Sequence, residues 1–386
     1  MYGRAVPRSC LLVLTVLATA MLPAPADAAL VVRKDAKDLS AQETSAFVAA
    51  VLKLKHTRAP GRKDGISIYD AFVEVHALAF EQSRDPAHGG AAFLPWHRAF
   101  LHAFEQQLQK VSGNDTIALP YWDWTNPAST RAVFSPALMG GSGDRKHDHA
   151  VTSGPFRRGR WKLWSGAPTV GAGPGSESES ASPFLPHRAQ GGIPIVGGPH
   201  VVRGTAAATY LQRELGGAEE DGITKLPTAE DMASVLGVQS YDSKPWNDAS
   251  DARYSFRCAL EGWGRPAAVD DLGSHNLVHM WVGGEWRSQG ELVAGTIASG
   301  ASPNDPAFWL IHANVERLWA QWEQTHGPAY DAGAGAGAGH HLHDKLRLLR
   351  RLGRDIGDTQ LASGTLRPED LLDPAPWEDP YQQPLA

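Results

Sequence analysis

The sequence predicts a mostly helical protein whose core is a four-helix bundle, with long loops and a few short strands around it. Four segments, at about 68–81, 95–108, 274–281 and 303–324, place apolar residues at helical spacing. Between about residues 129 and 250, glycine, proline and serine are frequent and the periodicity is weak, which is typical of long connections. No internal repeat of fixed period is present in the sequence.

The composition is that of a globular protein with a sizeable core. The 386 residues are 42% hydrophobic and 20% charged, and the formal net charge is -6. This mildly acidic balance includes no dense run of lysine and arginine, so we expect no nucleic-acid partner. Sixteen histidines are more than packing needs, and they are the first indication of metal or acid–base chemistry.

Residues 1–28 have the pattern of a secretory signal peptide. Two arginines precede an apolar run from Leu11 to Leu22, and Ala26 and Ala28 supply small residues for cleavage. That run is too short to span a membrane, and no later apolar run is long enough either. We therefore expect an exported protein, secreted or periplasmic, with no membrane association and a single domain over residues 29–386.

Three helices are predicted in the first 110 residues. Ser40 and Glu43 form the Ser-x-x-Glu capping pattern at the start of the first helix. The second helix, over 68–81, carries His76 within its apolar stripe. The third has Pro95 in its first turn, where proline is tolerated, and His97 on its apolar stripe.

Helical periodicity returns in the last third of the chain. The segment SHNLVHMW is one predicted helix, and PNDPAFWLIHANVERLWAQWEQ is the next. Asn304 or Asp305 can cap the latter helix, and Pro306 fits its first turn. The stretch DAGAGAGAGHHLHD that follows is predicted to be a flexible loop.

His275 and His279 are a candidate metal-ligand pair. They are four residues apart, so on a helix both imidazoles lie on one face and reach one ion. The pattern alone is a weak signal, but its apolar neighbours predict burial, and buried imidazoles need partners. His312, on the apolar stripe of the following helix, is a third candidate; the alternative is a core histidine bonded to a carbonyl. Asp305, two turns earlier, is expected to accept a proton from a ligand imidazole.

A second set of three histidines lies in the first part of the chain. His76 and His97 occupy the apolar stripes of their helices, and His88 lies in the connection between them. Four helices can bring both sets to one bundle centre. Six neutral imidazoles without carboxylate or thiolate suit copper better than calcium, magnesium or iron–sulfur clusters, and zinc is the remaining alternative.

The cysteines and the other histidines are expected to be structural. Cys258 is alone once Cys10 leaves with the signal segment, so no internal disulfide forms and we expect a buried apolar residue. His102 is five residues past His97 and off the ligand face. A further group of histidines is predicted to be solvated: His147, His149, His340, His341 and His343.

Longer segments carry a resemblance to a known family. FLPWHRAFLHAFEQQL, LPYWDW, HNLVHMWVGG and SPNDPAFWLIHANVERLW resemble the copper motifs of tyrosinases, the coupled binuclear copper oxidases, and look most like bacterial secreted members. The resemblance runs from about residue 40 to the C-terminus. It implies two copper ions, the first held by His76, His88 and His97 and the second by His275, His279 and His312.

The resemblance also implies roles for residues beside the ligands. Glu261 resembles the family's acidic residue that, with the asparagine at Asn276, holds a water able to deprotonate a monophenol. The connection from Glu261 to His275 is longer than expected for compact bacterial members, and the alternative for Glu261 is a capped or salt-bridged surface acid. Phe93 and Phe308, each four residues before a ligand histidine, are expected to wall the site.

The function implied by the resemblance is that of a secreted tyrosinase. Such an enzyme uses dioxygen to hydroxylate monophenols and to oxidise o-diphenols to o-quinones, which polymerise to melanin-like pigment. One alternative is a catechol or o-aminophenol oxidase without monophenolase activity, and another is a haemocyanin-like dioxygen carrier. A secreted zinc-binding structural protein comes last. The expected partners are a phenolic substrate, dioxygen and a possible copper chaperone.

Overall fold

The fold is taken from a computed structural model that describes residues 32–82, 85–165, 209–218, 223–262, 274–288, 291–333 and 335–372. Every element described below lies within Val31–Ala386. The predicted signal peptide therefore lies outside the described residues. Over the described ranges, no helix combines the length and the apolar character needed to cross a membrane.

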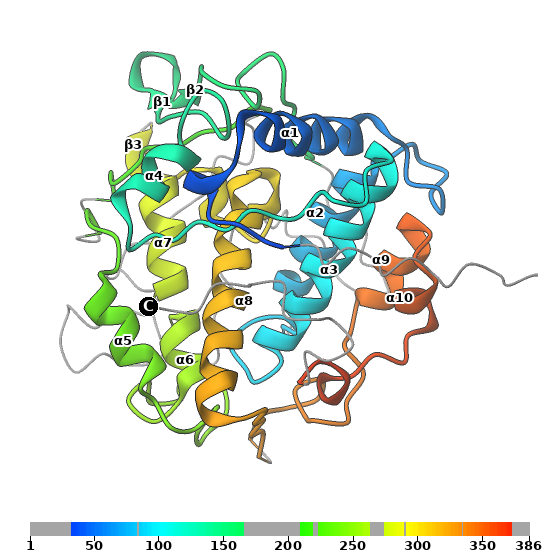
Figure 1. Cartoon of the computed structure of the whole chain (residues 1–386), viewed down its shortest axis with the longest axis vertical. Helices are drawn as coiled ribbons and strands as arrows, with labels where there is room; N and C mark the ends of the chain where they lie inside the picture. The colour runs from blue at the N-terminus through cyan, green and yellow to red at the C-terminus, as the bar shows by residue number, and fades with distance from the viewer. Residues whose placement is uncertain are drawn as a thin grey trace, which may run out of the picture. The chain divides into compact units, whose positions relative to one another are not determined.

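Helices dominate the described structure (Figure 1). The α-helices are α1 (Ala41–His56), α2 (Ile68–Glu81), α3 (Phe93–Ser112), α4 (Pro127–Val133), α5 (Ala229–Leu236), α6 (Phe256–Glu261), α7 (Ser274–Gly283), α8 (Ala307–His326), α9 (Leu349–Ile356) and α10 (Thr359–Ser363). The strands form two antiparallel pairs, β1 (Gly143–Asp144) with β2 (Ala150–Val151) and β3 (Glu285–Ser288) with β4 (Glu291–Ala294). The predicted mostly helical class with a few short strands is confirmed.

The first helices begin where the sequence signals place them. The Ser40 hydroxyl accepts the Glu43 amide, and the Glu43 carboxylate accepts the Ser40 amide, so the capping box of α1 is complete. Helix α2 has the predicted bounds. Helix α3 begins at Phe93, which puts Pro95 inside its first turn, and it ends at Gly113 with a left-handed φ of 69°.

Helix α8 lies between α7 on one side and α3 on the other (Figure 1). It begins at Ala307, directly after Pro306, and the carboxylate of Asp305 accepts the Ala307 amide at 3.0 Å. The helix therefore begins slightly later than predicted: Pro306 is its N-cap residue and not part of its first turn, and Asp305 rather than Asn304 bonds to the amide of Ala307.

Aromatic side chains fill the space between α2, α3 and α8. Phe104 of α3 stacks on Trp309 of α8 with ring centroids 3.5 Å apart, and Phe72 of α2 meets both rings edge-on. Phe72, Phe100 and Trp309 each lie one helical turn from a candidate ligand histidine, and all four of these aromatic side chains are buried. The packing of this core therefore fixes where three of the ligand positions lie.

A buried ionic group joins α3 to α8 beside the core. Arg98 donates to Glu316 at 3.0 Å and to Glu323 at 2.8 Å, and its guanidinium lies 3.5 Å from the Trp319 ring centroid. Removing one partner of a buried ion pair costs about 3–5 kcal/mol because the other charge is left uncompensated. Since Arg98 directly follows His97, this group also fixes the position of that ligand relative to α8.

Candidate metal centre

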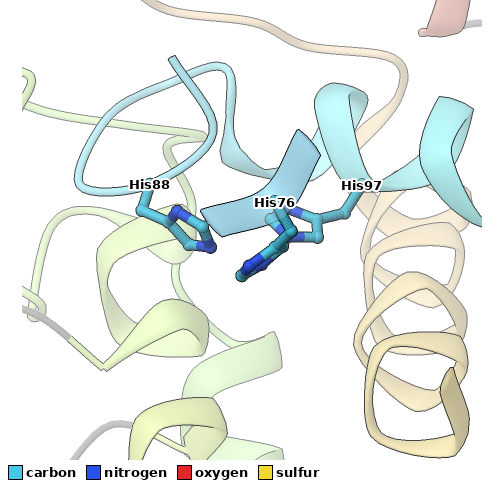
Figure 2. Close-up of side chains that lie close together, drawn as sticks. All are labelled: His76, His88 and His97. Atoms are coloured by element: carbon cyan, nitrogen blue, oxygen red, sulfur yellow. The ribbon is translucent and has the colours of Figure 1, made fainter. Parts of the chain in front are cut away.

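The first triad is formed by two helices and the loop between them. His76 comes from α2, His97 from α3 and His88 from the intervening loop, and Figure 2 shows the three rings turned toward one another. Each residue offers a nitrogen within 4.8 Å of the other two, and all three side chains are buried. The structure therefore brings together the first three candidate ligands of the sequence.

The Nδ1 atom of each ring in the first triad is already bonded. His76 Nδ1 donates to the carbonyl of Gly300 at 2.7 Å, and His97 Nδ1 donates to that of Phe93 at 2.9 Å. His88 Nδ1 contacts the carboxylate of Asp85 at 2.8 Å. These bonds fix the tautomer and the ring orientation, which leaves Nε2 as the free ligand atom.

The second triad comes from α7 and α8. His275 and His279 lie one turn apart on α7, and His312 lies on α8, with ligand nitrogens again within 4.8 Å of one another. His279 Nδ1 donates to the carbonyl of Ile297 at 2.9 Å. His275 Nδ1 lies 3.2 Å from the carbonyl oxygen of Glu261, and its Nε2 lies 3.1 Å from His312 Nε2. The core-histidine alternative for His312, with a bond to a carbonyl, is wrong: its Nδ1 has no partner within the described part of the chain.

The two triads face each other across a narrow aromatic space. The rings of His97 and His312 stack with centroids 4.4 Å apart and an interplanar angle of 15°. The ring centroid of Phe308 lies 4.0 Å from that of His312 and 5.0 Å from that of His76, so Phe308 packs against both triads. Phe93 does the same, 4.9 Å from His97 and 5.2 Å from the His275 ring. Both phenylalanines therefore border the site, as the sequence spacing predicts.

Burial keeps five of the six imidazoles neutral near pH 7. It lowers the pKa of His76 to about 3 and that of His279 to about 4. The pKa values of His97, His275 and His312 also lie well below the ordinary value, with burial again the main cause. A neutral imidazole has the lone pair that a metal ion requires, so these rings are already in the binding form.

His88 is the exception among the six. Burial lowers its pKa, but the adjacent Asp85 carboxylate and the more distant Glu261 charge raise it, and the overall shift is upward. A carboxylate on the outer nitrogen of a ligand histidine makes the inner nitrogen a more basic ligand. Asp85 was not identified from the sequence, although its position three residues before His88 was a usable signal.

The donor set fits two copper ions. The Nε2 atoms of His76, His97 and His279 are buried and have no hydrogen-bond partner among the described residues. Six neutral nitrogens in two groups of three, without thiolate or carboxylate among them, match the preference of copper for imidazole. Burying these Nε2 atoms without a partner is costly, and a metal ion bound to them would remove that cost.

Asp305 does not have the predicted contact with a ligand imidazole. Its carboxylate forms a two-bond ion pair with the guanidinium of Arg213, and both side chains are fully buried. Its remaining described contact is the amide of Ala307. The expectation that Asp305 orients a ligand is therefore wrong, because a buried arginine from a distant loop already takes both oxygens.

Glu261 and Asn276 lie on opposite sides of His275. The Asn276 side-chain oxygen and the Glu261 backbone oxygen both contact His275 Nδ1, at 3.0 and 3.2 Å. The Glu261 carboxylate accepts the amide of Gly89 at 2.6 Å and an Arg257 N–H at 3.2 Å. Glu261 is fully buried, so the alternative of a surface acid is wrong, while its predicted role toward a water stays a prediction.

Two of the histidines expected to be solvated are buried. His149 is 9% exposed and stacks on Trp286 with centroids 3.9 Å apart. His340 is 5% exposed and contacts the loop that carries His88. The His340 ring fits there because Gly90 has no Cβ atom, which would lie 2.6 Å from its Nδ1. Cys258 is buried as expected, and burial raises the pKa of its thiol to about 12.

The chain is similar to known proteins over most of its length. Residues 66–325 match the family model described as the common central domain of tyrosinase. A tyrosinase of Streptomyces lincolnensis is 38% identical over 310 residues, which are 79% of this chain and 87% of that protein. Grixazone synthase of Streptomyces griseus is 34% identical over 308 residues, 76% of this chain and 85% of that protein.

The fold has a match among solved structures as well. A pro-tyrosinase of Aspergillus oryzae aligns with a TM-score of 0.50 at 18% identity, covering 92% of this chain and 69% of that one. At that identity the likeness concerns the fold alone. Together with the two facing histidine triads, the family model and the bacterial relatives show that this chain belongs to the tyrosinase family of binuclear copper oxidoreductases.

Proposed function

We propose that this protein is an exported tyrosinase that hydroxylates monophenols and oxidises o-diphenols to o-quinones. The observation that carries the proposal is that the two triads face each other. The His97 ring of the first triad stacks on the His312 ring of the second. When bound, the two coppers supply dioxygen binding and two-electron oxidation. A monophenol and one dioxygen then give one o-quinone and one water, whereas two catechols share one dioxygen and give two waters.

The side chains around the triads provide a dry and rigid site. Phe93 and Phe308 touch rings of both triads and are fully buried, so they exclude water from the space between them. The bonded Nδ1 atoms prevent rotation of most of the rings. A fixed spacing between the two ligand sets is the contribution that a protein makes to two-metal chemistry.

We propose that Glu261 takes the proton of a monophenol through a water shared with Asn276. Among the described residues, the Nδ2 atom of Asn276 is buried without a partner, which leaves a donor available for that water. The Glu261 carboxylate lies on the other side of His275 from Asn276, where it accepts from Gly89 and Arg257.

The second candidate is an oxidase of catechols or o-aminophenols without monophenolase activity. It is favoured by the contacts of the Glu261 carboxylate with Arg257 and Gly89, since a carboxylate that holds the loop carrying His88 has a structural use without any proton transfer. A haemocyanin-like dioxygen carrier would have the same two triads. It differs from both oxidases in turning over no phenol.

We also propose export and participation in pigment formation. The support for export is the signal-like pattern of residues 1–28, and the support for pigment is the reactivity of the o-quinone product. A copper chaperone is a further proposed partner, because the ligand rings are 9% exposed or less and an ion needs a route to them. Expression of the full chain and sequencing of the exported product would test export, with a mature start after Ala28 expected.

Oxygen uptake by the copper-loaded protein tests the activity. Tyrosine and its catechol counterpart are compared as substrates, with His312→Ala as the inactive control. Uptake on both substrates, with one dioxygen per quinone on tyrosine and one for every two quinones on the catechol, is expected. Uptake on the catechol alone would select the second candidate. Two bound coppers without uptake on either substrate would select the carrier.

A further inference from the structure

The loop that carries His88 is held from outside by three segments of the chain. We call residues 85–92 the His88 loop. The Glu261 carboxylate accepts the amide of Gly89 at 2.6 Å, and the Tyr241 hydroxyl donates to the carbonyl of Ala91 at 2.5 Å. The third contact comes from His340, which lies about 250 residues further along the chain. Neither Tyr241 nor His340 is a candidate metal ligand.

His340 contacts both ends of the His88 loop. Its Nε2 lies 2.9 Å from the carbonyl oxygen of Asp85, and its Nδ1 lies 3.2 Å from the amide of Ala92. A carbonyl only accepts and an amide N–H only donates, so the ring is neutral, with its proton on Nε2 and its lone pair on Nδ1. Both polar atoms of this buried ring are therefore used to close the loop.

The position of His340 is itself fixed. The side chain is 5% exposed, and the Tyr330 hydroxyl donates to the His340 carbonyl at 2.7 Å. Gly90 lies against the ring so closely that a Cβ atom there would be 2.6 Å from His340 Nδ1. A methyl group at position 90 would therefore displace the ring or the loop, so the two segments are fitted to each other.

The contact at Asp85 leads directly to the metal ligand. The backbone of Asp85 bonds to His340, and its carboxylate bonds to His88 Nδ1 at 2.8 Å. A ligand on a loop has no helix to fix it, so its orientation depends on such contacts. The other five ligand histidines lie on α2, α3, α7 and α8.

We propose that His340 is a positioning residue for the first copper site, where it closes the His88 loop and aims the Asp85 carboxylate at His88. The proposal rests on the copper pair of the proposed function but not on its substrate. If the wild-type chain binds two coppers yet oxidises no phenol, the proposed function is refuted, but the positioning role of His340 is not. The measurement is therefore copper retention rather than activity.

Five variants separate this role from a general effect on stability. His340→Leu removes both bonds, whereas His340→Gln keeps an amide that can both donate and accept. His341→Ala is the matched control, because His341 is in the same loop and bonds to Ala332 instead. His88→Asn/His340→Leu is compared with His88→Asn alone, so that the remaining copper reports on the second site.

Each copper-loaded chain is equilibrated against increasing concentrations of a copper chelator, and the copper retained per chain is measured together with the far-ultraviolet circular dichroism. We expect His340→Leu to lose one copper at about 10- to 100-fold lower chelator concentration than wild type and to keep the other. His340→Gln should recover most of the loss, and His341→Ala should match wild type. In the His88→Asn background, His340→Leu should not change retention of the remaining copper.

Wild-type retention of both coppers by His340→Leu would overturn the proposal. Equal weakening of both coppers, or a further loss in the His88→Asn background, would also overturn it by showing a general structural role. If His340→Leu does not fold, Gly90→Ala decides the question, because it keeps the histidine and displaces its ring. Normal retention by a folded Gly90→Ala chain would then count against the proposal.

Discussion

The two histidine triads contain the same ligand atoms but are supported differently. In the first triad, backbone carbonyls hold two of the rings and a carboxylate holds the third, His88. In the second triad a carbonyl holds His279, two acceptors share the Nδ1 of His275, and His312 has no Nδ1 partner within the described residues. The difference follows from where the ligands lie in the chain.

A ligand on a loop needs hydrogen bonds, whereas a ligand on a buried helix can be held by packing. His88 is the one ligand outside a helix, and it is the one with a carboxylate partner. His312 lies on α8 with the ring centroids of Phe308 and His97 4.0 and 4.4 Å from its own, so neighbouring rings restrict it instead. We expect the two metal sites to respond differently to substitutions beyond the ligands.

Removal of one ligand from either triad has the largest expected effect. His76→Ala and His312→Ala should each retain one copper per chain and show background oxygen uptake, because the oxidation needs both ions. The two variants should differ in apo stability, since His76→Ala leaves the buried carbonyl of Gly300 without its donor, which costs about 1–3 kcal/mol. Copper analysis, oxygen uptake and denaturant unfolding check these outcomes.

His102→Ala is the matched control, because His102 lies on α3 with His97 but off the ligand face. It should bind two coppers and keep its activity. Equal apo stability of His76→Ala and His312→Ala would contradict the difference in support that we infer between the triads.

Glu261→Gln tests the residue that contacts both triads. Its carboxylate accepts the amide of Gly89, the residue after His88, and its backbone oxygen contacts Nδ1 of His275. If Glu261 is the general base that we propose, its loss should slow monophenol turnover by about 100- to 10,000-fold and leave catechol oxidation nearly unchanged. Equal losses on tyrosine and its catechol counterpart would instead mean that Glu261 acts by holding the His88 loop. The ratio of the two initial rates is the quantity to compare.

Asp85→Ala should affect the first triad alone. Without the carboxylate on His88 Nδ1, affinity for the first copper should fall by about 10- to 100-fold, while the second copper stays bound. Asp144→Ala is a close control, since Asp144 also contacts a histidine three residues later, His147, but does so at the surface. Copper titration of both variants gives the comparison, and equal loss from both sites would refute it.

The pH dependence of apo stability should differ between the triads. The folded pKa of His275 lies below its unfolded value of about 6.5, so the unfolded chain binds that proton first and stability falls as pH drops below 6.5. The pKa of His88 is raised, so its contribution is present below pH 6.5 and is lost as pH rises through the folded value. The two pKa shifts therefore change the stability of the apo protein in opposite directions as the pH falls.

In the metal-free protein, His275→Asn should flatten the loss of stability below pH 6.5 by up to about 1.4 kcal/mol per pH unit. His88→Asn should leave the slope below pH 6.5 unchanged and should instead remove a loss of stability that occurs as pH rises above 6.5, because the raised pKa of His88 stabilises the fold only on the acidic side. Unfolding by denaturant between pH 4 and 8 measures both slopes. Equal slopes in the two variants would show that Asp85 does not set the charge of His88.

Local sequence patterns were enough to predict the five longest helices and the candidate ligands, but not the short helices α4, α5, α6, α9 and α10. The capping residues Ser40 and Glu43, the stripe that carries His76 and the i, i+4 spacing of His275 and His279 each act within a few residues. Such patterns depend on helix geometry, which the local chain decides. The two sets of three histidines read from the sequence, which the resemblance to tyrosinases assigned to two coppers, are the triads that the structure brings together.

Only the tertiary structure decided what the outer nitrogens of the ligands contact. The carbonyls of Ile297 and Gly300 carry no sequence signal, because every residue has a carbonyl. Asp305 had a plausible local role, but a distant arginine, Arg213, took its carboxylate. His340 looked like a loop residue, yet chain packing placed it on the His88 loop. Contacts between distant segments depend on how the whole core packs, and no local spacing encodes that.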